Sequence, residues 1–275
     1  MILNTRDGPL YFEATGRGPG LVFVSGWAMS CECWRPVVRL LEGGFRCVIY
    51  DQRGIARSQP VTATAGFTVE DHAEDLHAIL QATGTFDAAF VAHEQGSLIA
   101  ARCADRHPQD LNSLVVASPR TGIEEDEIRR LAVYTPATLA LRELAAFPLL
   151  RNVVAWRFRR APQPYRDILF NDFAGLNPRA GYETALSMAD PASAAEVERF
   201  LKETRLPLLF ASGERDKKSG VEARRLFSFV ERGKLAVVRG AGFLPMLEYP
   251  VQFARLLYSF IATSTGAGGK RLLTR

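Results

Sequence analysis

The stretch Phe90–Ala100, FVAHEQGSLIA, decides how this sequence is expected to fold. The apolar run Ala89–His93 passes through a few polar and small residues directly into the helix-like segment Leu98–Arg106. Short continuous apolar runs are typical of strands that are covered on both faces, as in parallel sheets with crossover helices. The stretch therefore predicts one strand–turn–helix unit of an α/β protein, with residues 94–97 in the turn.

The same alternation continues on both sides of this unit. The other strand-like runs are Ile2–Thr5, Leu10–Thr15, Leu21–Ser25, Arg46–Asp51, Leu114–Ser118, Pro207–Ser212 and Leu235–Val238. The first two suggest a hairpin around Asp7-Gly8-Pro9. Helix-like segments lie between the runs, at Trp34–Leu41, Val69–Thr83, Val221–Phe229 and Val251–Ile261. The pattern predicts a mostly parallel central sheet with an N-terminal antiparallel hairpin and helices on both faces.

One long segment breaks the alternation. Residues 121–204 contain amphipathic, Ala- and Leu-rich pieces that are interrupted by prolines, and no strand-like run. We expect a helical insertion here, after the sixth strand. The predicted organisation is a core formed by 1–120 and 205–262, a helical insertion at 121–204 and a flexible tail at 263–275.

Composition excludes several classes of protein. The chain has 275 residues, of which 47% are apolar and 23% charged, so it is not mostly disordered. A net charge of +4 without a long Lys or Arg run gives no sign of nucleic-acid binding. No apolar stretch reaches the roughly 18 residues of a membrane span, and no secretion signal is apparent, so we expect a cytoplasmic protein. The chain has four cysteines, Cys31, Cys33, Cys47 and Cys103, and they form no paired metal-binding pattern. We expect neither a metal nor a cofactor.

Five motifs, in order, resemble those of the α/β-hydrolase superfamily, in particular lid-bearing esterases, haloalkane dehalogenases and epoxide hydrolases. They are Leu21–Trp27 (LVFVSGW), Asp51–Ser58 (DQRGIARS), Phe90–Ala100, Pro207–Asp216 (PLLFASGERD) and Gly240–Pro250 (GAGFLPMLEYP). The resemblance covers roughly residues 10–262. It implies an α/β-hydrolase fold in which the helical insertion at 121–204 is a lid.

The resemblance also implies a substituted catalytic triad. The nucleophile position holds Glu94 instead of Ser, the base position holds Phe243 instead of His, and the acid position holds Asp216. A serine hydrolase needs a base to activate first the serine and then water. An ester formed on Glu94 would likewise need a His-activated water, which Phe243 does not supply. We therefore expect no ordinary hydrolysis of esters, amides or epoxides.

Further site residues follow from the same resemblance. The backbone N–H groups of Trp27 and Gln95 are expected to hold a substrate oxygen, as in an oxyanion hole. The residues expected to line a largely apolar pocket are Ser25, Gly26, Phe243 and Trp156. With Glu94 as general acid/base and Asp216 orienting water or a hydroxyl, the site suits a cofactor-independent cyclase, isomerase, dehydratase or lyase of biosynthesis.

Two alternatives stay open beside this enzyme hypothesis. A non-catalytic protein that binds a ligand or acts as a scaffold would also have lost the Ser–His pair, and a residual esterase is the third possibility. The segment 151–166 carries five arginines interleaved with aromatic residues and no acid before Asp167. It predicts an anionic or carrier-protein-bound small-molecule substrate. The alternative is a solvated helix face whose arginines reach into water.

Overall fold

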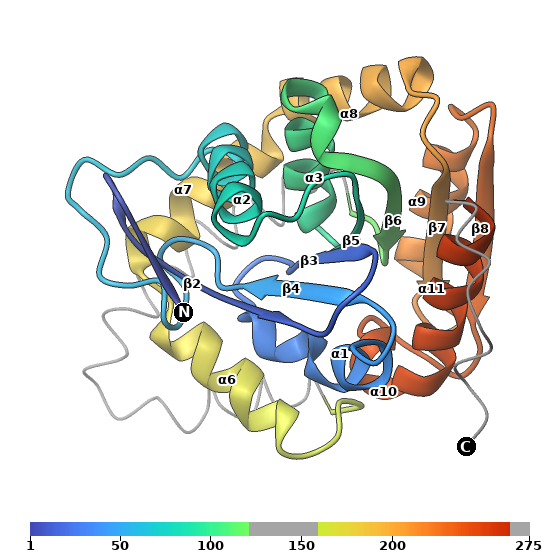
Figure 1. Ribbon diagram of the computed structural model, residues 1–275, viewed down its shortest axis with the longest axis horizontal. Helices are drawn as coiled ribbons and strands as arrows, with labels where there is room; N and C mark the ends of the chain where they lie inside the picture. The colour runs from blue at the N-terminus through green and yellow to red at the C-terminus, as the bar shows by residue number, and fades with distance from the viewer. Residues whose placement is uncertain (121–158, 265–275) are drawn as a thin grey trace.

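The core of the protein is a single eight-stranded sheet (Figure 1), seen in a computed structural model that describes residues 1–120 and 159–264. Along the sheet the strands follow the order β1-β2-β4-β3-β5-β6-β7-β8. Their bounds are β1 Ile2–Thr5, β2 Gly8–Thr15, β3 Gly20–Val24, β4 Arg46–Tyr50, β5 Ala88–His93, β6 Leu111–Ala117, β7 Leu208–Gly213 and β8 Gly233–Val238. Each of the eight predicted strands is present.

Strand pairing confirms the predicted sheet type. Neighbours from β4 through β3, β5, β6 and β7 to β8 pair in parallel. By contrast, β2 runs antiparallel to both β1 and β4, which gives the N-terminal hairpin. At the centre of the sheet Val24 of β3 lies opposite Ala92 of β5. Because parallel strands end at the same edge, the residues after β3 and β5 meet there.

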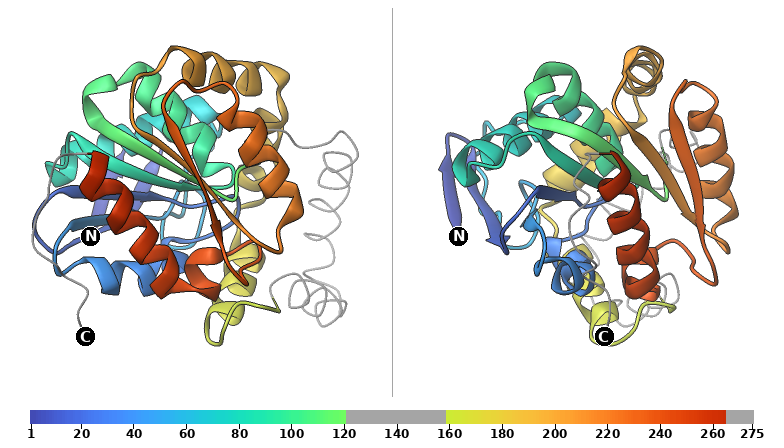
Figure 2. Two further views of the ribbon diagram at one scale, coloured as in Figure 1. Left: turned by 90° about the vertical axis from the view of Figure 1, so that its right-hand side faces the viewer. Right: turned by 45° about the vertical axis from the view of Figure 1, so that its right-hand side comes forward.

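Helices cover both faces of the sheet (Figure 2), as predicted. Side chains alternate along each strand: Val22 and Val24 of β3 pack towards one layer, Leu21 and Phe23 towards the other. The first layer contains α2 (Val69–Thr83), α3 (Gly96–Arg106), α8 (Pro191–Glu203) and α9 (Lys217–Phe227). The second contains the 3-10 turn η1 (Cys31–Trp34), α1 (Arg35–Leu41), α10 (Pro245–Glu248) and α11 (Pro250–Ser264).

Local sequence explains where α2 begins and ends. The Thr68 hydroxyl accepts a hydrogen bond from the Asp71 N–H at 3.1 Å, and the Asp71 carboxylate accepts one from the Thr68 N–H at 2.9 Å. This reciprocal pair satisfies two backbone donors at the start of the helix. Gly84 ends it with φ +61°, a left-handed conformation that favours glycine. The helix has the bounds predicted from the sequence.

The described part of the predicted insertion, 159–204, is helical. It contains α6 (Tyr165–Gly175), α7 (Pro178–Ala189) and α8, and no strand within 159–204. The α6–α7 connection lies against the loop that follows β4, since the Asn177 N–H donates to the Gly54 carbonyl at 3.0 Å. At the C-terminal end, α11 includes the first two residues of the predicted tail and ends at Ser264. The rest of that tail, like 121–158, lies outside the described residues.

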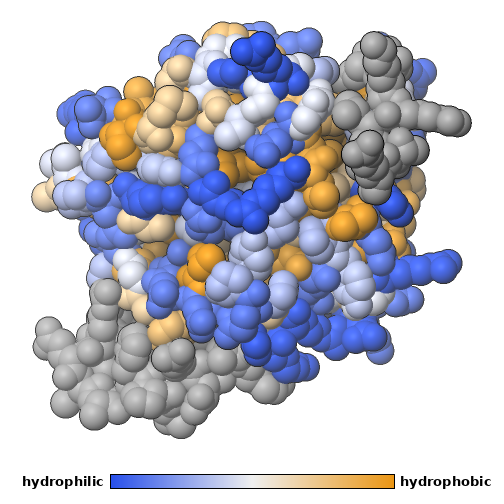
Figure 3. All heavy atoms as spheres, turned by 60° about the horizontal axis from the view of Figure 1, so that its bottom comes forward, coloured by the Kyte–Doolittle hydropathy of each residue, from blue (hydrophilic) through white to orange (hydrophobic). Residues whose placement is uncertain are grey.

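One face of the described surface is mixed in character. Figure 3 shows one face on which hydrophobic residues are interspersed among hydrophilic ones rather than joined into one continuous surface. Small hydrophobic patches are normal on folded proteins. Among the described helices, none combines the length and the apolar character that crossing a membrane requires.

Candidate functional site

Glu94 occupies a sharp turn between β5 and α3. Its φ is +51°, a left-handed conformation that is uncommon for residues other than glycine. The backbone holds it there: the Glu94 N–H donates to the Ala117 carbonyl of β6 at 2.9 Å, and the Glu94 carbonyl accepts from the Ser97 N–H at 3.2 Å. The Ser97 hydroxyl donates to the same carbonyl. The surrounding structure thus fixes a strained residue at the carboxyl edge of the sheet.

The Glu94 side chain lies beside Gly26 of the loop after β3. A Cβ atom on Gly26 would lie 2.7 Å from Glu94 Oε2 and 2.8 Å from His93 Nδ1. Both distances are shorter than real Cβ contacts, so a larger residue at position 26 would displace the carboxylate or the imidazole. The loop after β3 and the turn after β5 therefore form one compact site.

His93 belongs to this site, although the sequence analysis gave it no role. It is fully buried, and its Nε2 lies 2.9 Å from the Phe243 carbonyl oxygen. Since a carbonyl oxygen only accepts hydrogen bonds, Nε2 carries the hydrogen and Nδ1 is the acceptor in the neutral ring. Nδ1 and Glu94 Oε2 flank the same point above Gly26. The Phe243 ring packs against the imidazole, with the centroids 4.8 Å apart at 64°.

Arg120 is a second residue that the sequence analysis missed. It follows β6, and its guanidinium carbon lies 4.8 Å from the centroid of the Phe243 ring. Phe243 thus touches both Arg120 and His93. The signal that would have found Arg120 is its place just beyond the carboxyl end of a buried strand, where α/β proteins bind ligands.

The two predicted backbone donors lie at the ends of β3 and β5. Trp27 follows Gly26, and its indole turns to the described insertion, where Nε1 donates to the Gly181 carbonyl at 3.0 Å. The indole also meets the Phe173 ring edge-on, with centroids 6.0 Å apart. Gln95 is buried at the start of α3, and its Oε1 has no hydrogen-bond partner among the described residues. Their role towards a substrate oxygen stays a prediction.

Ser25 and Asp216 have structural contacts of their own. The buried Ser25 hydroxyl accepts a hydrogen bond from Trp34 Nε1 at 3.2 Å. Asp216 caps α9: its carboxylate accepts from the Ser219 N–H at 3.3 Å and from the Ser219 hydroxyl at 2.5 Å. The loop before Asp216 lies beside the loop of Phe243, because the Arg215 N–H donates to the Ala241 carbonyl at 2.8 Å. Trp156, the remaining predicted pocket residue, lies outside the described residues.

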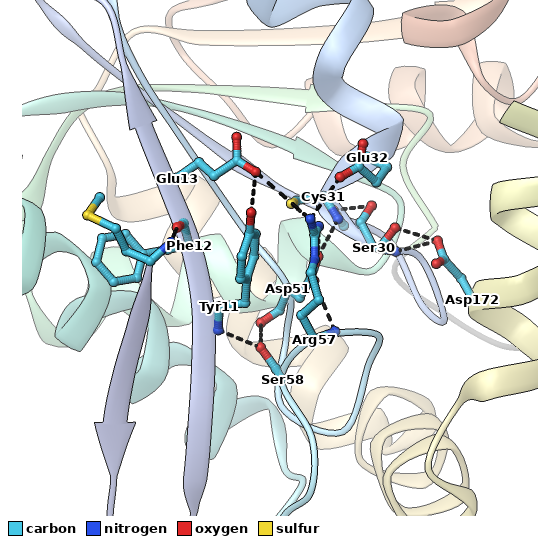
Figure 4. A network of polar contacts seen from close by, with 12 residues as sticks. Tyr11, Phe12, Glu13, Ser30, Cys31, Glu32, Asp51, Arg57, Ser58 and Asp172 are labelled. Carbon is cyan, nitrogen blue, oxygen red and sulfur yellow. Dashed lines mark hydrogen bonds and ion pairs between the residues drawn. The ribbon is translucent and has the colours of Figure 1, made fainter. Parts of the chain in front are cut away.

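A polar network adjoins the site where α6 meets the loop after β3. Figure 4 shows Asp172 of α6 pointing to Ser30, whose N–H and hydroxyl donate to Oδ2 at 2.8 and 2.6 Å. Burial raises the pKa of Asp172 to about 6. Asp51 accepts from the Cys31 N–H at 2.8 Å and from Arg57 Nε at 2.8 Å. Burial also raises the pKa of the Cys31 thiol, which disfavours the thiolate form that a nucleophile needs.

One group of side chains in the described ranges has donors suited to a metal ion: His77, His107 and Asp110, with ligand atoms within 4.8 Å of one another. His77 Nδ1 already lies 2.6 Å from Asp110 Oδ2, and the two imidazoles stack at 3.6 Å and 3°. Parallel stacked rings direct their lone pairs along separate planes, so they do not converge on one ion. His107 lies at the opposite end of α3 from Glu94. We assign these residues to packing.

Comparison with known proteins agrees with the fold. A family model described as alpha/beta hydrolase fold matches residues 19–227. A Variovorax paradoxus protein named as a carbamate hydrolase, RutD, is 37% identical over 113 residues, which are 40% of this chain and 42% of that protein. The chain therefore spans about two fifths of that relative. An Escherichia coli O157:H7 protein of the same name is 29% identical over 189 residues, 66% of this chain and 68% of that protein.

Solved structures show the same architecture. A thermophilic esterase from Thermogutta terrifontis, with malate bound, superimposes with a TM-score of 0.81 at 20% sequence identity, covering 96% of this chain and 98% of that one. This likeness concerns the fold alone. Together with the matched family model and the eight-stranded sheet, it establishes that the chain belongs to the alpha/beta hydrolase fold family.

Proposed function

We propose that this chain is a non-hydrolytic enzyme in which Glu94 is the general acid/base for a small, largely apolar metabolite. The observation that carries the proposal is the position of the Glu94 carboxylate, which lies against Gly26 beside His93 at the carboxyl edge of the sheet. A carboxylate needs only hydrogen-bond reach of a substrate to transfer a proton. Cyclisation, isomerisation, dehydration and decarboxylation are reactions of this kind that need no acyl-enzyme.

The neighbours of Glu94 support proton transfer over covalent hydrolysis. A serine-type mechanism needs a hydroxyl and an imidazole, and the turn presents Glu94 while the loop opposite presents Phe243. The Phe243 ring takes up no proton and keeps water away. His93 Nδ1 borders the same point above Gly26 as Glu94 Oε2, which puts an imidazole beside the proposed acid/base. In this proposal the backbone N–H groups of Trp27 and Gln95 donate hydrogen bonds to a substrate oxygen.

The test is untargeted mass spectrometry of a metabolite extract incubated with the wild type and with Glu94→Gln. A compound that only the wild type consumes is the expected result, and its mass change gives the reaction class: none for isomerisation, loss of water or carbon dioxide for elimination. Glu183→Gln is the matched control, since Glu183 pairs with Arg179 on α7. A compound consumed equally by wild type and Glu94→Gln would refute the proposal.

Hydrolysis is the second candidate, favoured by the carbamate hydrolase name of the RutD relatives. In the same experiment it predicts a product that has gained one water. A third outcome, a compound that co-purifies with the protein and is never converted, would identify a binding protein. The hydrogen bonds from Ser219 to Asp216 favour the binding protein, because capping of α9 is enough to explain an acid at this position without any catalytic role.

A further inference from the structure

Arg120 is connected to His93 of the candidate site through the ring of Phe243, which contacts both residues. The guanidinium carbon lies 4.8 Å from the Phe243 ring centroid, and that ring lies 4.8 Å from the His93 ring. Arg120 is also close along the sheet edge, since it follows Ala117, whose carbonyl holds the Glu94 N–H. The Arg120 guanidinium thus lies over the Phe243 ring, at the apolar side of the site that contains the Glu94 carboxylate.

Arg120 differs from the other arginines that lie over aromatic rings. Arg179 lies over Phe67 and bonds to Glu183 and to backbone carbonyls. Arg57 lies over Tyr11 and pairs with Asp51. Arg120 Nε is buried without a hydrogen-bond partner, and within the described ranges no acid pairs with Arg120. A buried donor without a partner costs free energy that a bound acceptor would recover.

A second polar group at the same strand end is also without a partner. Ser118 is fully buried, its Oγ has no hydrogen-bond partner among the described residues, and its φ is +47°. Its N–H is used, donating to the Ala211 carbonyl of β7 at 2.7 Å. The end of β6 therefore holds two buried polar atoms without a partner among the described residues, Ser118 Oγ and Arg120 Nε.

We propose that Arg120 binds a carboxylate of the ligand of this site, which makes the substrate a small carboxylic acid. The proposal rests on the proposed function for its place, because it assumes that ligands bind beside Glu94. A guanidinium matches the two oxygens of a carboxylate. The Phe243 face would pack against the hydrocarbon body and direct it to Glu94. A phosphate ester is disfavoured, because its second negative charge would add to the repulsion from the Glu94 carboxylate.

The experiment measures binding by ligand-observed NMR, using matched probes without reactive groups. Straight-chain carboxylates of four to ten carbons are compared with their neutral amides and with the corresponding alkyl phosphates. The wild type should prefer the carboxylate over both. Arg120→Gln should weaken carboxylate binding about tenfold or more while leaving amide binding unchanged. Arg179→Gln, the matched arginine over a phenylalanine ring, should bind like the wild type.

Three results would overturn the proposal: equal binding of acid and amide, tighter binding of the phosphate, or no carboxylate binding at any chain length. Arg120→Lys keeps the charge without the planar fork and should bind with intermediate affinity, which covers the case in which Arg120→Gln does not fold. Glu94→Gln should bind the carboxylate at least as well as the wild type. Carboxylate binding here, combined with no Glu94-dependent consumption in the metabolite experiment, would therefore refute the proposed function and leave the Arg120 site standing.

Discussion

The Glu94 carboxylate lies so close to Gly26 that a Cβ atom on residue 26 would be 2.7 Å from Oε2. Two chain segments that are almost seventy residues apart in sequence thus meet at the carboxyl edge of the sheet. The carboxylate can take this position because residue 26 has no side chain. A substitution of Gly26 therefore tests whether the position of the carboxylate matters.

Gly26→Ala should displace the carboxylate and reduce Glu94-dependent turnover about a hundredfold, because misplacing a reacting group by about 1 Å has effects of that size. The rate of consumption of the metabolite found with the wild type is the measurement. Gly43→Ala is the control, since a Cβ on Gly43 would meet nothing within 4 Å. A wild-type rate in Gly26→Ala would show that the carboxylate does not work from this position.

Replacing both family positions at once should convert the site. In Glu94→Ser/Phe243→His the turn would present a hydroxyl and the opposite loop an imidazole, which are the groups of a serine hydrolase. We expect hydrolysis of p-nitrophenyl acetate at least about a hundredfold above either single variant, the usual contribution of a positioned base. Additive effects of the two single changes would mean that residues 94 and 243 do not face one another as the motif resemblance implies.

Stability should depend strongly on the buried pair of Arg53 and Asp75. Arg53 Nε and Nη2 donate to the two oxygens of Asp75 at 2.6 Å each, and both residues are buried. Asp75→Asn removes the buried counter-charge and leaves the guanidinium only its longer ion pair to the less buried Asp7, at 3.2 Å, so the free energy of unfolding should fall by about 3–5 kcal/mol. Urea denaturation measures this. Glu183→Gln, which removes an exposed partner, should change the free energy by about 0–1 kcal/mol; equal effects would contradict the prediction.

Asp172 should make stability depend on pH in the acidic range. Burial raises its pKa from 3.8 to about 6, so the folded state retains the proton more strongly than the unfolded chain. The contribution to stability is therefore complete below about pH 4 and is lost as the pH rises to about 6, by up to about 3 kcal/mol. The measurement is urea unfolding of wild type and Asp172→Asn from pH 4 to pH 7. Parallel curves for the two proteins would disprove the assignment.

The sequence was informative wherever short-range signals decide the structure. Continuous apolar runs located all eight strands, and the residues Thr68 and Gly84 marked the ends of α2 because capping and left-handed φ are local effects. Spacing along the motif was enough to place Glu94 at the turn after β5. These predictions depend only on residues that are close in sequence, so a single sequence is enough to make them.

The site was less predictable, because its contacts join distant segments. Arg120 meets Phe243 and His93 meets the Phe243 carbonyl, and nothing within a few residues of any of them reports the other. Asp216 shows the opposite difficulty: its place in the motif suggested chemistry, whereas its hydrogen bonds to Ser219 serve the start of α9. Motifs locate a residue on the fold, while its partners depend on packing.

The hydrogen bonds that shape the turn at residue 94 engage its main chain: the N–H binds the Ala117 carbonyl, and the Glu94 carbonyl binds the Ser97 N–H and hydroxyl. The main-chain hydrogen bonds thus fix the position of residue 94 without requiring a particular side chain there. A substitution at residue 94 would alter reactivity while the sheet and helices around it stay in place. A family built on such a turn can change its chemistry by a single substitution at this position.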